Sequence, residues 1–374
     1  MRTNGKPQTT IWYDDQNQCI VIIDQTLLPH RFEIIPLITL QDYCCAIRTM
    51  QVRGAPLIGV TAAFGLAIAL SNDPSINNAA DASEKLLATR PTAVNLRWAI
   101  ERVHSAMGQA PEQQRASIAM QEAKKIRADD ILICEAIGNH GLPLIHKLHQ
   151  HKLQQQNHQN TTLNILTHCN AGWLATVDWG TALAPIYKAH QAGLPIHIWV
   201  DETRPRNQGS SLTAWELQQQ GIPHTVIADN TGGHLMQHGL VDLCIVGSDR
   251  TTASGDVCNK IGTYLKALAA KDNNIPFYVA LPSSTIDWTI DHGIEDIPIE
   301  QRDAKEITHM TGLDAQGKIS EIQLIANSPA ANYAFDITPA ELVSGLITEH
   351  GLYSPNQQSL GKLQQRLRAL KTNI

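Results

Sequence analysis

The sequence predicts an α/β protein in which a mainly helical N-terminal domain with a small β-sheet precedes a second domain built on a parallel sheet. Two patterns support this prediction. Helical apolar periodicity dominates the first half of the chain, whereas short apolar strands alternate with helical stretches in the second half. Such alternation is typical of parallel strands with helices on both faces of the sheet. The second domain is therefore expected to be Rossmann-like.

The first domain, residues 1–150, is expected to begin with two strands, at 10–13 and 19–24. Helical apolar patterns then follow one another along the chain. They lie at 40–50, 59–70, 92–107, 111–138 and 142–148. The most apolar stretch, at 60–70, is too short to span a bilayer and predicts a buried helix.

The polar, glutamine-rich segment 149–162 predicts an exposed connector and marks the expected domain boundary. Apolar runs after it predict the strands of the second domain, residues 160–353. They lie at 163–167, 196–200, 225–228, 243–246 and 277–281, with helices expected at 176–191 and 211–220. The tail, 354–374, contains LGKLQQRLRALK, which predicts a helical surface or packing segment rather than a membrane anchor.

The composition narrows the class of protein. The chain has 374 residues, 43% of them hydrophobic, and a net charge of −6, which argues against a general nucleic-acid binder. No apolar core that would indicate a signal peptide is found near the N-terminus. Seven cysteines without regular spacing disfavour a disulfide framework. We therefore expect a cytoplasmic enzyme with no membrane association. A small anionic substrate fits this class, because a local arginine pocket can oppose the overall charge.

Neither a cofactor nor a metal ion is predicted. The GxGxxG fingerprint of dinucleotide-binding domains is missing after every predicted strand. His234 and His238 stand four residues apart, a spacing that could place two ligands on one helical face. No glutamate lies between them and no third ligand accompanies them, so a zinc site is not expected. The three histidines of segment 149–162 are assigned to a solvated linker rather than to a metal site.

Cys169 follows the strand predicted at 163–167 and precedes Asn170-Ala171-Gly172, where a helix is expected to start. The carboxyl edge of a parallel sheet is where ligands bind in open α/β folds. A thiol that faces a helix N-terminus there has its thiolate favoured by the helix dipole. The alternative is a buried structural cysteine, which is the usual fate of this residue type.

Asp249 occupies the equivalent end of the strand predicted at 243–246, followed by a polar loop, by Asn259-Lys260 and by a helix. Gly247 and Ser248 leave room for a ligand beside it. A carboxyl group there is a candidate general acid or base, with a pKa that burial would raise. The alternative is a structural carboxylate that caps the following turn through backbone N–H groups.

The candidate substrate-binding residues are polar groups and glycines in predicted loops. They are Arg53, Gly54, Ala55, Arg90, Gln208, Asn259 and Lys260. Arginine and lysine are suited to phosphate, glycine permits close approach of the backbone, and an amide beside Gly209 suits a sugar hydroxyl. For the arginines the alternative is a surface salt bridge, and for the lysine it is an exposed position at the start of a helix.

The chain resembles the methylthioribose-1-phosphate isomerase family from about residue 11 to about residue 353. The resemblance is carried by long segments in the right order. They include MQVRGAPLIGVTAAFG, RPTAVNLRWAI, LTHCNAGWLATVDWGTAL, VDETRPRNQGSSLTAWEL, SGDVCNKIGTY and FYVALPSSTID. The resemblance implies a homodimer that converts 5-methylthioribose 1-phosphate to 5-methylthioribulose 1-phosphate without a cofactor, in methionine salvage.

The resemblance also implies roles for particular residues. Cys169 and Asp249 match the catalytic cysteine and aspartate of the family, and the seven binding candidates match its substrate-binding positions. Three places depart from the family pattern near the expected site: segment 230–233, which is usually more apolar, Ser248 and Ser254. Two alternatives stay open. One is a ribose-1,5-bisphosphate isomerase, and the other is a non-enzymatic regulatory subunit of a translation-initiation exchange factor.

Overall fold

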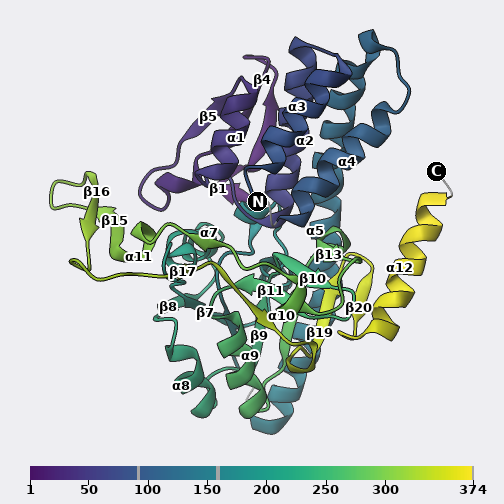
Figure 1. Cartoon of the computed structure of the whole chain (residues 1–374). Coiled ribbons are helices and arrows are strands. Elements are labelled where there is room, and N and C mark those ends of the chain that lie inside the picture. Colours follow the sequence, from purple (N-terminus) through teal and green to yellow (C-terminus); the bar gives the residue numbers. More distant parts are fainter. Residues whose placement is uncertain (91–92, 157–160, 373–374) are drawn as a thin grey trace.

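The computed structural model describes residues 1–90, 93–156 and 161–372. The N-terminal part holds a three-stranded antiparallel sheet, with β3 (Ile11–Asp14), β4 (Cys19–Ile23) and β5 (Ile34–Leu37) in that order. It also holds α1 (Leu40–Arg48), α2 (Ala55–Asn72), α3 (Ile76–Leu87) and α4 (Val94–Met107), beside a short pair β1 (Arg2–Thr3) and β2 (Lys6–Pro7). Figure 1 shows this part stacked on the larger C-terminal sheet. The strands predicted at 10–13 and 19–24 and the helices predicted at 40–50 and 59–70 are confirmed, as is the helix at 92–107 from Val94 onward, residue 92 lying outside the described residues. Helix α3 and strand β5 were not predicted.

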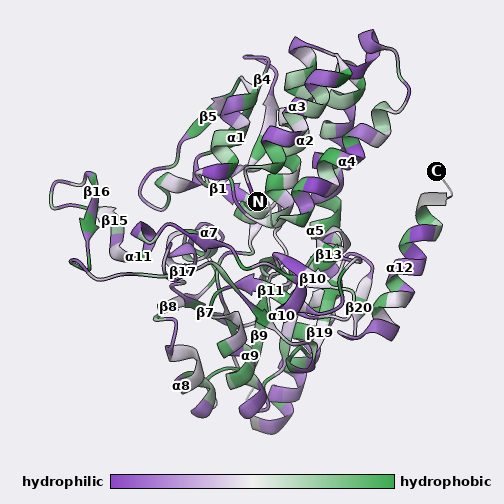
Figure 2. Cartoon of the chain, viewed as in Figure 1, coloured by the Kyte–Doolittle hydropathy of each residue, from purple (hydrophilic) through white to green (hydrophobic). Residues whose placement is uncertain are grey.

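Helix α2 lies at the centre of the N-terminal part and is apolar all around its axis (Figure 2). It is long and apolar enough to cross a membrane, but 78% of this 18-residue span is buried inside the protein. Helices α1, α3, α4 and α5 all contact it. A helix that is hydrophobic on every side belongs in a core, so the prediction of a buried helix is confirmed.

Helix α5 (Glu112–Gln156) runs for 45 residues and corrects two predictions. The segments 111–138 and 142–148 form one helix, although Pro143 lies inside it. Gly138 and Gly141 let α6 approach closely, since a Cβ at Gly141 would lie 2.4 Å from Pro185. The helix continues through 149–156, so this stretch is helical rather than a loop, although residues 150, 151, 154 and 155 are exposed as expected. His149 is buried, and its Nε2–H donates to the Thr161 carbonyl oxygen at 2.8 Å. The histidine at 158 lies outside the described residues.

The C-terminal part is built on a seven-stranded sheet in the order β20-β19-β12-β9-β6-β7-β8. All neighbours are parallel except β20, which pairs antiparallel with β19 at the edge. The strands are β6 (Leu163–Thr167), β7 (Ile196–Asp201), β8 (His224–Ile227), β9 (Leu243–Val246), β12 (Phe277–Ala280), β19 (Gly345–Thr348) and β20 (Gly351–Tyr353). The five predicted strands are confirmed. The last two were missed because they are short and contain glycine.

Helices cover both faces of this sheet, as predicted. Leu163 and Ile165 of β6 point into a core shared with α5, with α6 (Leu183–Gln191) and with α7 (Ala214–Gln219). Leu166 points to the opposite core, which contains α8 (Thr231–Gln237), α9 (Thr263–Asp272) and α12 (Gln357–Thr372). This alternation follows from the two-residue period of a strand. The tail helix α12 buries two leucines in that core, so it is a packing helix, as expected.

The segment after β6 corrects a third prediction. No helix covers residues 176–182, and α6 begins only at Leu183, after a 3₁₀ turn at Trp173–Ala175. Glu216 holds this turn, because its carboxylate accepts the backbone N–H groups of Trp173 and Leu174 at 2.8 and 3.0 Å. The helix predicted at 211–220 is likewise divided, into a π-helical turn (Gly209–Thr213) and α7.

A second, four-stranded sheet was not predicted. It pairs β13 (Ile286–Asp287), β10 (Arg250–Thr252), β11 (Val257–Lys260) and β18 (Phe335–Thr338), in that order. The polar loop expected after Asp249 is therefore the hairpin β10–β11. An arm completes the fold, with α10 (Gly293–Asp296), β14 (Gln301–Arg302), α11 (Lys305–Thr308), β15 (His309–Leu313), β16 (Ile319–Gln323) and β17 (Asn332–Tyr333). The β15–β16 hairpin projects from one side of the molecule (Figure 1).

Candidate active site

All nine residues expected at the site line one cavity of about 50 Å³. They are Arg53, Gly54, Ala55, Arg90, Cys169, Gln208, Asp249, Asn259 and Lys260. The cavity lies where the carboxyl ends of β6, β7 and β9 meet the start of α2 and the hairpin β10–β11. This is the edge at which open parallel sheets bind ligands. Residues that are up to 207 positions apart in the chain, from Arg53 to Lys260, are thus brought together.

Cys169 is buried and belongs to the cavity lining. Its backbone has a φ of +65°, which is strained for a residue with a side chain. Its N–H donates to Thr203 Oγ1 at 2.8 Å, and its thiol donates to Gln208 Oε1 at 3.3 Å. No helix starts at 170–172, so the expected helix-dipole effect is wrong. Burial instead raises the pKa of the thiol, although Arg53 and Lys260 act in the opposite direction. The group is therefore held as a thiol.

Asp249 is enclosed by protein, and part of its side chain is accessible from the cavity. Burial raises the pKa of its carboxyl group, which confirms the expected direction, while Lys260 and Arg90 oppose the shift. Among the described residues its carboxylate caps no turn. The contact that fixes its position is its backbone N–H, which donates to the Cys258 carbonyl at 3.0 Å. Among the described residues the side chain has no hydrogen-bond partner, as a candidate general acid that faces a ligand would require.

The cations of the site differ in how they are neutralised. Arg90 is buried and pairs with Glu300 at 3.1 Å, so it forms an ion pair inside the protein rather than at the surface. Within the described residues, the hydrogen-bond partners of Arg53 are neutral groups, the side chain and the carbonyl oxygen of Asn170. Lys260 ends β11 rather than starting a helix, and its ammonium lies 4.8 Å from the centre of the Phe335 ring. Burial lowers its pKa. Uncompensated positive charge therefore gathers at Arg53 and Lys260.

The start of α2 adds backbone donors to this positive end. Gly54 has a φ of +92°, and a Cβ there would lie 2.4 Å from the Ala175 carbonyl oxygen, so only glycine fits. No side chain caps the helix, and the first N–H groups of any α-helix lack partners within it. Such a terminus is suited to an anion. Gly54 and Ala55 therefore belong to the site through their backbone.

Several residues of the site were not predicted. Asn170 connects Arg53 to Glu216, whose buried carboxylate also accepts the Tyr187 hydroxyl at 2.5 Å. Phe335 closes the cavity from β18, and Asn259 is held by its amide, which donates to Thr263 Oγ1 at 3.0 Å. A glutamate in a largely apolar stretch, LTAWEL, is the one sequence signal that could have pointed to Glu216, because carboxylates are rarely fully buried without partners.

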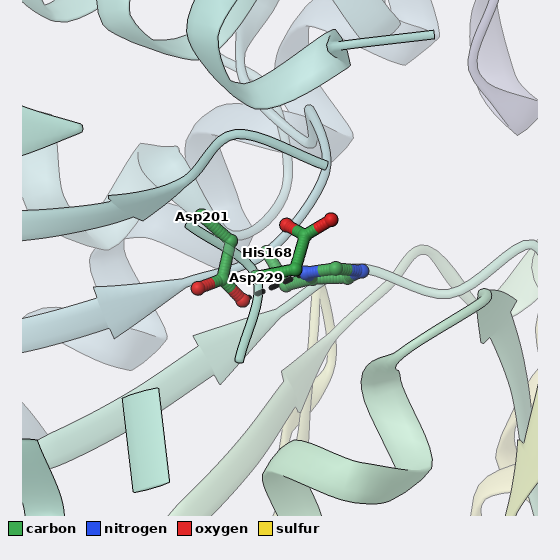
Figure 3. A group of neighbouring side chains, drawn as sticks. All are labelled: His168, Asp201 and Asp229. Carbon is green, nitrogen blue, oxygen red and sulfur yellow. Dashed lines mark hydrogen bonds and ion pairs between the residues drawn. The ribbon is translucent and has the colours of Figure 1, made fainter. Parts of the chain in front are cut away.

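A cluster of His168, Asp201 and Asp229 adjoins the cavity, which His168 itself lines, and has the composition of a metal site (Figure 3). Its groups already have protein partners. The imidazole of His168 meets an Asp201 carboxylate oxygen at Nδ1 and the Ile261 carbonyl at Nε2, both at 2.8 Å. The Lys266 ammonium lies 3.0 Å from Asp201 Oδ2. Asp229 accepts the backbone N–H groups of residues 203 and 204, each at 2.7 Å.

The contacts of His168 give this cluster a structural role. The two ring nitrogens contact Asp201 and the Ile261 carbonyl, and the Lys266 ammonium lies beside the same Asp201 carboxylate. The imidazole also connects two backbone segments: His168 precedes Cys169, and Ile261 follows Lys260. It therefore holds the thiol and the ammonium of the site in register.

A larger cavity of about 330 Å³ opens onto the site and is called the vestibule here. It shares Met50, Arg53 and Gln208 with the smaller cavity. Its other walls come from the N-terminal part, from the loop 205–212 and from the arm, including Lys305, His309 and Met310. Cys169 and Asp249 do not line it. The two candidate catalytic residues therefore lie in the smaller cavity alone, beside the vestibule.

A parallel-sheet domain whose carboxyl edge holds a carboxyl group, a thiol and a cluster of positive charge has the features of a protein that binds a small anionic molecule. The chain belongs to the Initiation factor 2 subunit family, whose family model matches residues 51–355. It is 60% identical over 361 residues to the methylthioribose-1-phosphate isomerase of Methylocella silvestris, covering 96% of this chain and 97% of that one.

Solved structures agree with this assignment. The 5-methylthioribose 1-phosphate isomerase of Pyrococcus horikoshii OT3 superposes with a TM-score of 0.81 at 36% identity, and 96% of each chain is covered. The translation initiation factor eIF-2B, subunit delta, from A. fulgidus superposes with a TM-score of 0.74 at 37% identity, covering 95% of this chain and 100% of that one.

Proposed function

We propose that this protein is an aldose–ketose isomerase that converts 5-methylthioribose 1-phosphate to 5-methylthioribulose 1-phosphate, a step of methionine salvage. Relatives with this name match nearly the whole chain at up to 60% identity. The observation that carries the proposal is the convergence of an enclosed carboxyl group, a buried thiol and two uncompensated cations on one cavity. A protein that acts only by assembly has no need of such a site.

The substrate explains why an acid is needed. Its phosphate group is on the anomeric carbon, so the sugar ring cannot open by simple hemiacetal exchange. Asp249 donates its proton to the ring oxygen, and the bond from that oxygen to C1 breaks. Because burial raises its pKa, the carboxyl group keeps its proton to higher pH than an exposed aspartate would. The resulting carboxylate then accepts a proton later in the reaction.

Hydrogen then moves from C2 to C1 by one of two routes. In a hydride shift, hydrogen passes directly between the carbons and the C2 hydroxyl proton goes to Asp249. In the enolate route, a base removes the C2 hydrogen as a proton, and another proton is added at C1. Cys169 assists the transfer or stabilises its transition state as a thiol. Deuterium from solvent at C1 of the product would exclude a pure hydride shift.

The phosphate group lies at the positive end of the cavity. Arg53 and Lys260 supply charge there, and the first N–H groups of α2 supply donors. Arg90 stands nearby with its charge already balanced by Glu300, so it orients more than it neutralises. Gln208 and Asn259 offer amides to the sugar hydroxyls. Binding energy from the phosphate group thereby fixes the reacting carbons relative to Asp249 and Cys169.

A proton and phosphorus NMR assay tests this function. Purified protein is mixed with 5-methylthioribose 1-phosphate and, separately, with ribose 1,5-bisphosphate. Ketose is expected from the thiomethyl substrate. Turnover of the bisphosphate alone would keep the chemistry but change the substrate, and no turnover of either by folded protein would contradict an enzymatic role. The homodimer and the cytoplasmic location implied by the resemblance stay predictions, and light scattering after gel filtration measures the first.

A further inference from the structure

We propose that Glu300, a residue of the arm, is a positioning residue of the active site that balances the charge of Arg90 and thereby keeps Asp249 in its acid form. The inference rests on the proposed function, in which Asp249 is the acid, and deepens it by assigning a residue that acts on this acid from outside the cavity. Glu300 directly precedes β14, and its carbonyl oxygen accepts the backbone N–H of Ala334 at 2.9 Å. Its backbone is therefore fixed beside Phe335, which lines the cavity.

Glu300 reaches the site through the guanidinium group of Arg90. Its Oε2 accepts Arg90 Nε at 3.2 Å and lies 3.1 Å from Arg90 Nη2, so one carboxylate oxygen meets two donors. The side chains of Arg90 and Glu300 are only 10% and 19% exposed, which leaves the pair poorly screened by solvent. Arg90 lines the catalytic cavity together with Asp249, whereas Glu300 lines no part of it. Glu300 therefore acts on the site without touching a ligand.

The charges around Asp249 show why the charge of Arg90 matters. Burial raises the pKa of the Asp249 carboxyl group, and Glu300 acts in the same direction. Three cations, Lys260, Arg90 and Arg53, oppose this shift. An uncompensated cation favours the ionised carboxylate, which cannot donate a proton. The other titratable or charged groups nearby are His168, Cys169, Cys258 and the paired Arg250 and Asp287.

The charge count fits the binding of a phosphate ester by a site with a neutral acid. Arg53 and Lys260 bring two uncompensated positive charges, and a phosphate monoester carries about −1.5 to −2 at pH 7. These charges cancel when Glu300 balances Arg90. Without Glu300 a third positive charge would remain, and ionisation of Asp249 would offset it. Glu300 thus keeps the guanidinium group at the cavity while removing its effect on the acid.

Glu300 belongs to a row of alternating charges that supplies a matched control. Its Oε1 accepts Arg302 Nη1 at 2.9 Å. Arg302 Nη2 donates to Glu306 at 2.7 Å, and Glu306 pairs with Arg206 at 2.8 Å. Glu306 lines the vestibule and not the catalytic cavity, and its partner Arg206 is 29% exposed. Replacing Glu306 therefore disturbs the same row of ion pairs without adding charge beside Arg90.

Infrared titration of the free protein measures the protonation of Asp249 without any substrate. The carbonyl band of its protonated carboxyl group is assigned by its loss in Asp249→Asn and is followed as pH rises. We expect this band to disappear about one pH unit lower in Glu300→Gln than in the wild type, because a cation within about 4–6 Å lowers the pKa of a carboxyl group by about 1–3 units. Glu306→Gln is the control and should leave the transition unchanged. Circular dichroism establishes that each variant is folded.

The double variant Arg90→Gln/Glu300→Gln separates charge from structure. It removes one positive and one negative charge, so the net charge beside Asp249 is that of the wild type although the contact with the arm is lost. We expect its infrared transition to return to the wild-type pH. Should Glu300→Gln fail to fold, the effect of Glu300 is measured as the fall in this pH from Arg90→Gln to the double variant.

The outcomes separate this inference from the proposed function. A transition that Glu300→Gln leaves in place, that Glu306→Gln shifts equally, or that the double variant fails to restore would overturn the inference. A wild-type protein that titrates as expected but converts no 5-methylthioribose 1-phosphate would overturn the proposed function alone. A wild-type protein without the Asp249 band even at low pH would overturn both, because the acid would then be ionised. The expected result is a shift in Glu300→Gln only, reversed by the second substitution at Arg90.

Discussion

Two polar clusters meet at the same edge of the sheet, and His168 of one directly precedes Cys169 of the other. In the first, called the lower cluster, the buried side chains of His168 and Lys266 both contact Asp201 Oδ2, although Asp201 Oδ1 has no hydrogen-bond partner. In the second, called the upper cluster, Asp249, Cys169 and Lys260 are enclosed but have few permanent partners. Both carry a desolvation cost, and the lower cluster offsets more of it within the protein. The difference marks the lower cluster as structural and the upper one as built for a ligand.

The two clusters differ in whether their charged groups have partners in the free protein. A buried charge that is fully paired contributes to stability as long as its partners stay, and removing one partner costs about 3–5 kcal/mol. A charge that waits for a ligand costs stability in the free protein and is compensated on binding. Substitutions in the two clusters should therefore separate activity from stability. The following tests are ordered from the largest expected effect to the smallest.

Asp249→Asn should cause the largest loss of activity. The amide has nearly the same shape but cannot donate the ring-opening proton, and losing a general acid costs about 10²–10⁴-fold in rate. Steady-state kinetics with 5-methylthioribose 1-phosphate measures kcat. Near-normal turnover by the folded variant would remove Asp249 from the role of acid.

Cys169→Ser should reduce kcat by about 10²-fold, the lower end of the range for groups that assist proton transfer. The hydroxyl group keeps the donor to Gln208, so the loop should stay in place while the softer sulfur is lost from the reacting centre. Kinetics together with thermal unfolding measures both quantities. A variant with full activity would make the cysteine structural.

His168 offers a matched pair of variants in the lower cluster. The Gln amide can reach the position of Nε2 and keep a donor to Ile261, whereas the Asn amide reaches only the position of Nδ1. We expect His168→Asn to lower kcat about tenfold more than His168→Gln, with KM little changed, because a small misplacement of reacting groups is costly. Equal losses of kcat in both variants would show that the connection to Ile261 does not position the site.

The pH dependence of kcat/KM is expected to show the smallest of these effects. The pKa of Asp249 is raised, so its acid form is complete at low pH and is lost as pH rises through that pKa. The ratio kcat/KM should therefore fall as pH rises through this pKa. Lys260, whose pKa is lowered, would lose its charge in the same direction. Lys260→Arg keeps the charge, so an alkaline fall that persists in this variant belongs to Asp249, and its disappearance would assign the fall to the lysine.

The sequence allowed much of the site to be predicted, because position at a strand end is a local property. Cys169 and Asp249 could be placed from the apolar runs that precede them. Contacts between distant segments could not. The pairing of Arg90 with Glu300 joins residues 210 positions apart, and neither segment contains a sequence pattern that predicts the contact. Likewise, the helical patterns at 111–138 and 142–148 did not show that they join in one helix, in which Gly138 and Gly141 serve close packing of α6 on α5. The hairpin β10–β11 was missed because its strands are polar and short.

The most direct test of the contrast is the free energy of unfolding of Asp249→Asn and Asp201→Asn, measured side by side by denaturation at pH 8. The folded-state pKa of Asp249 is raised, so its ionised form is disfavoured in the folded protein at this pH, and the neutral amide removes that cost. We expect Asp249→Asn to be at least as stable as the wild type. Asp201→Asn leaves the buried Lys266 ammonium without its carboxylate and should lose about 3–5 kcal/mol. Equal destabilisation of the two variants would contradict the account, because Asp249 would then be a structural ion-pair partner like Asp201.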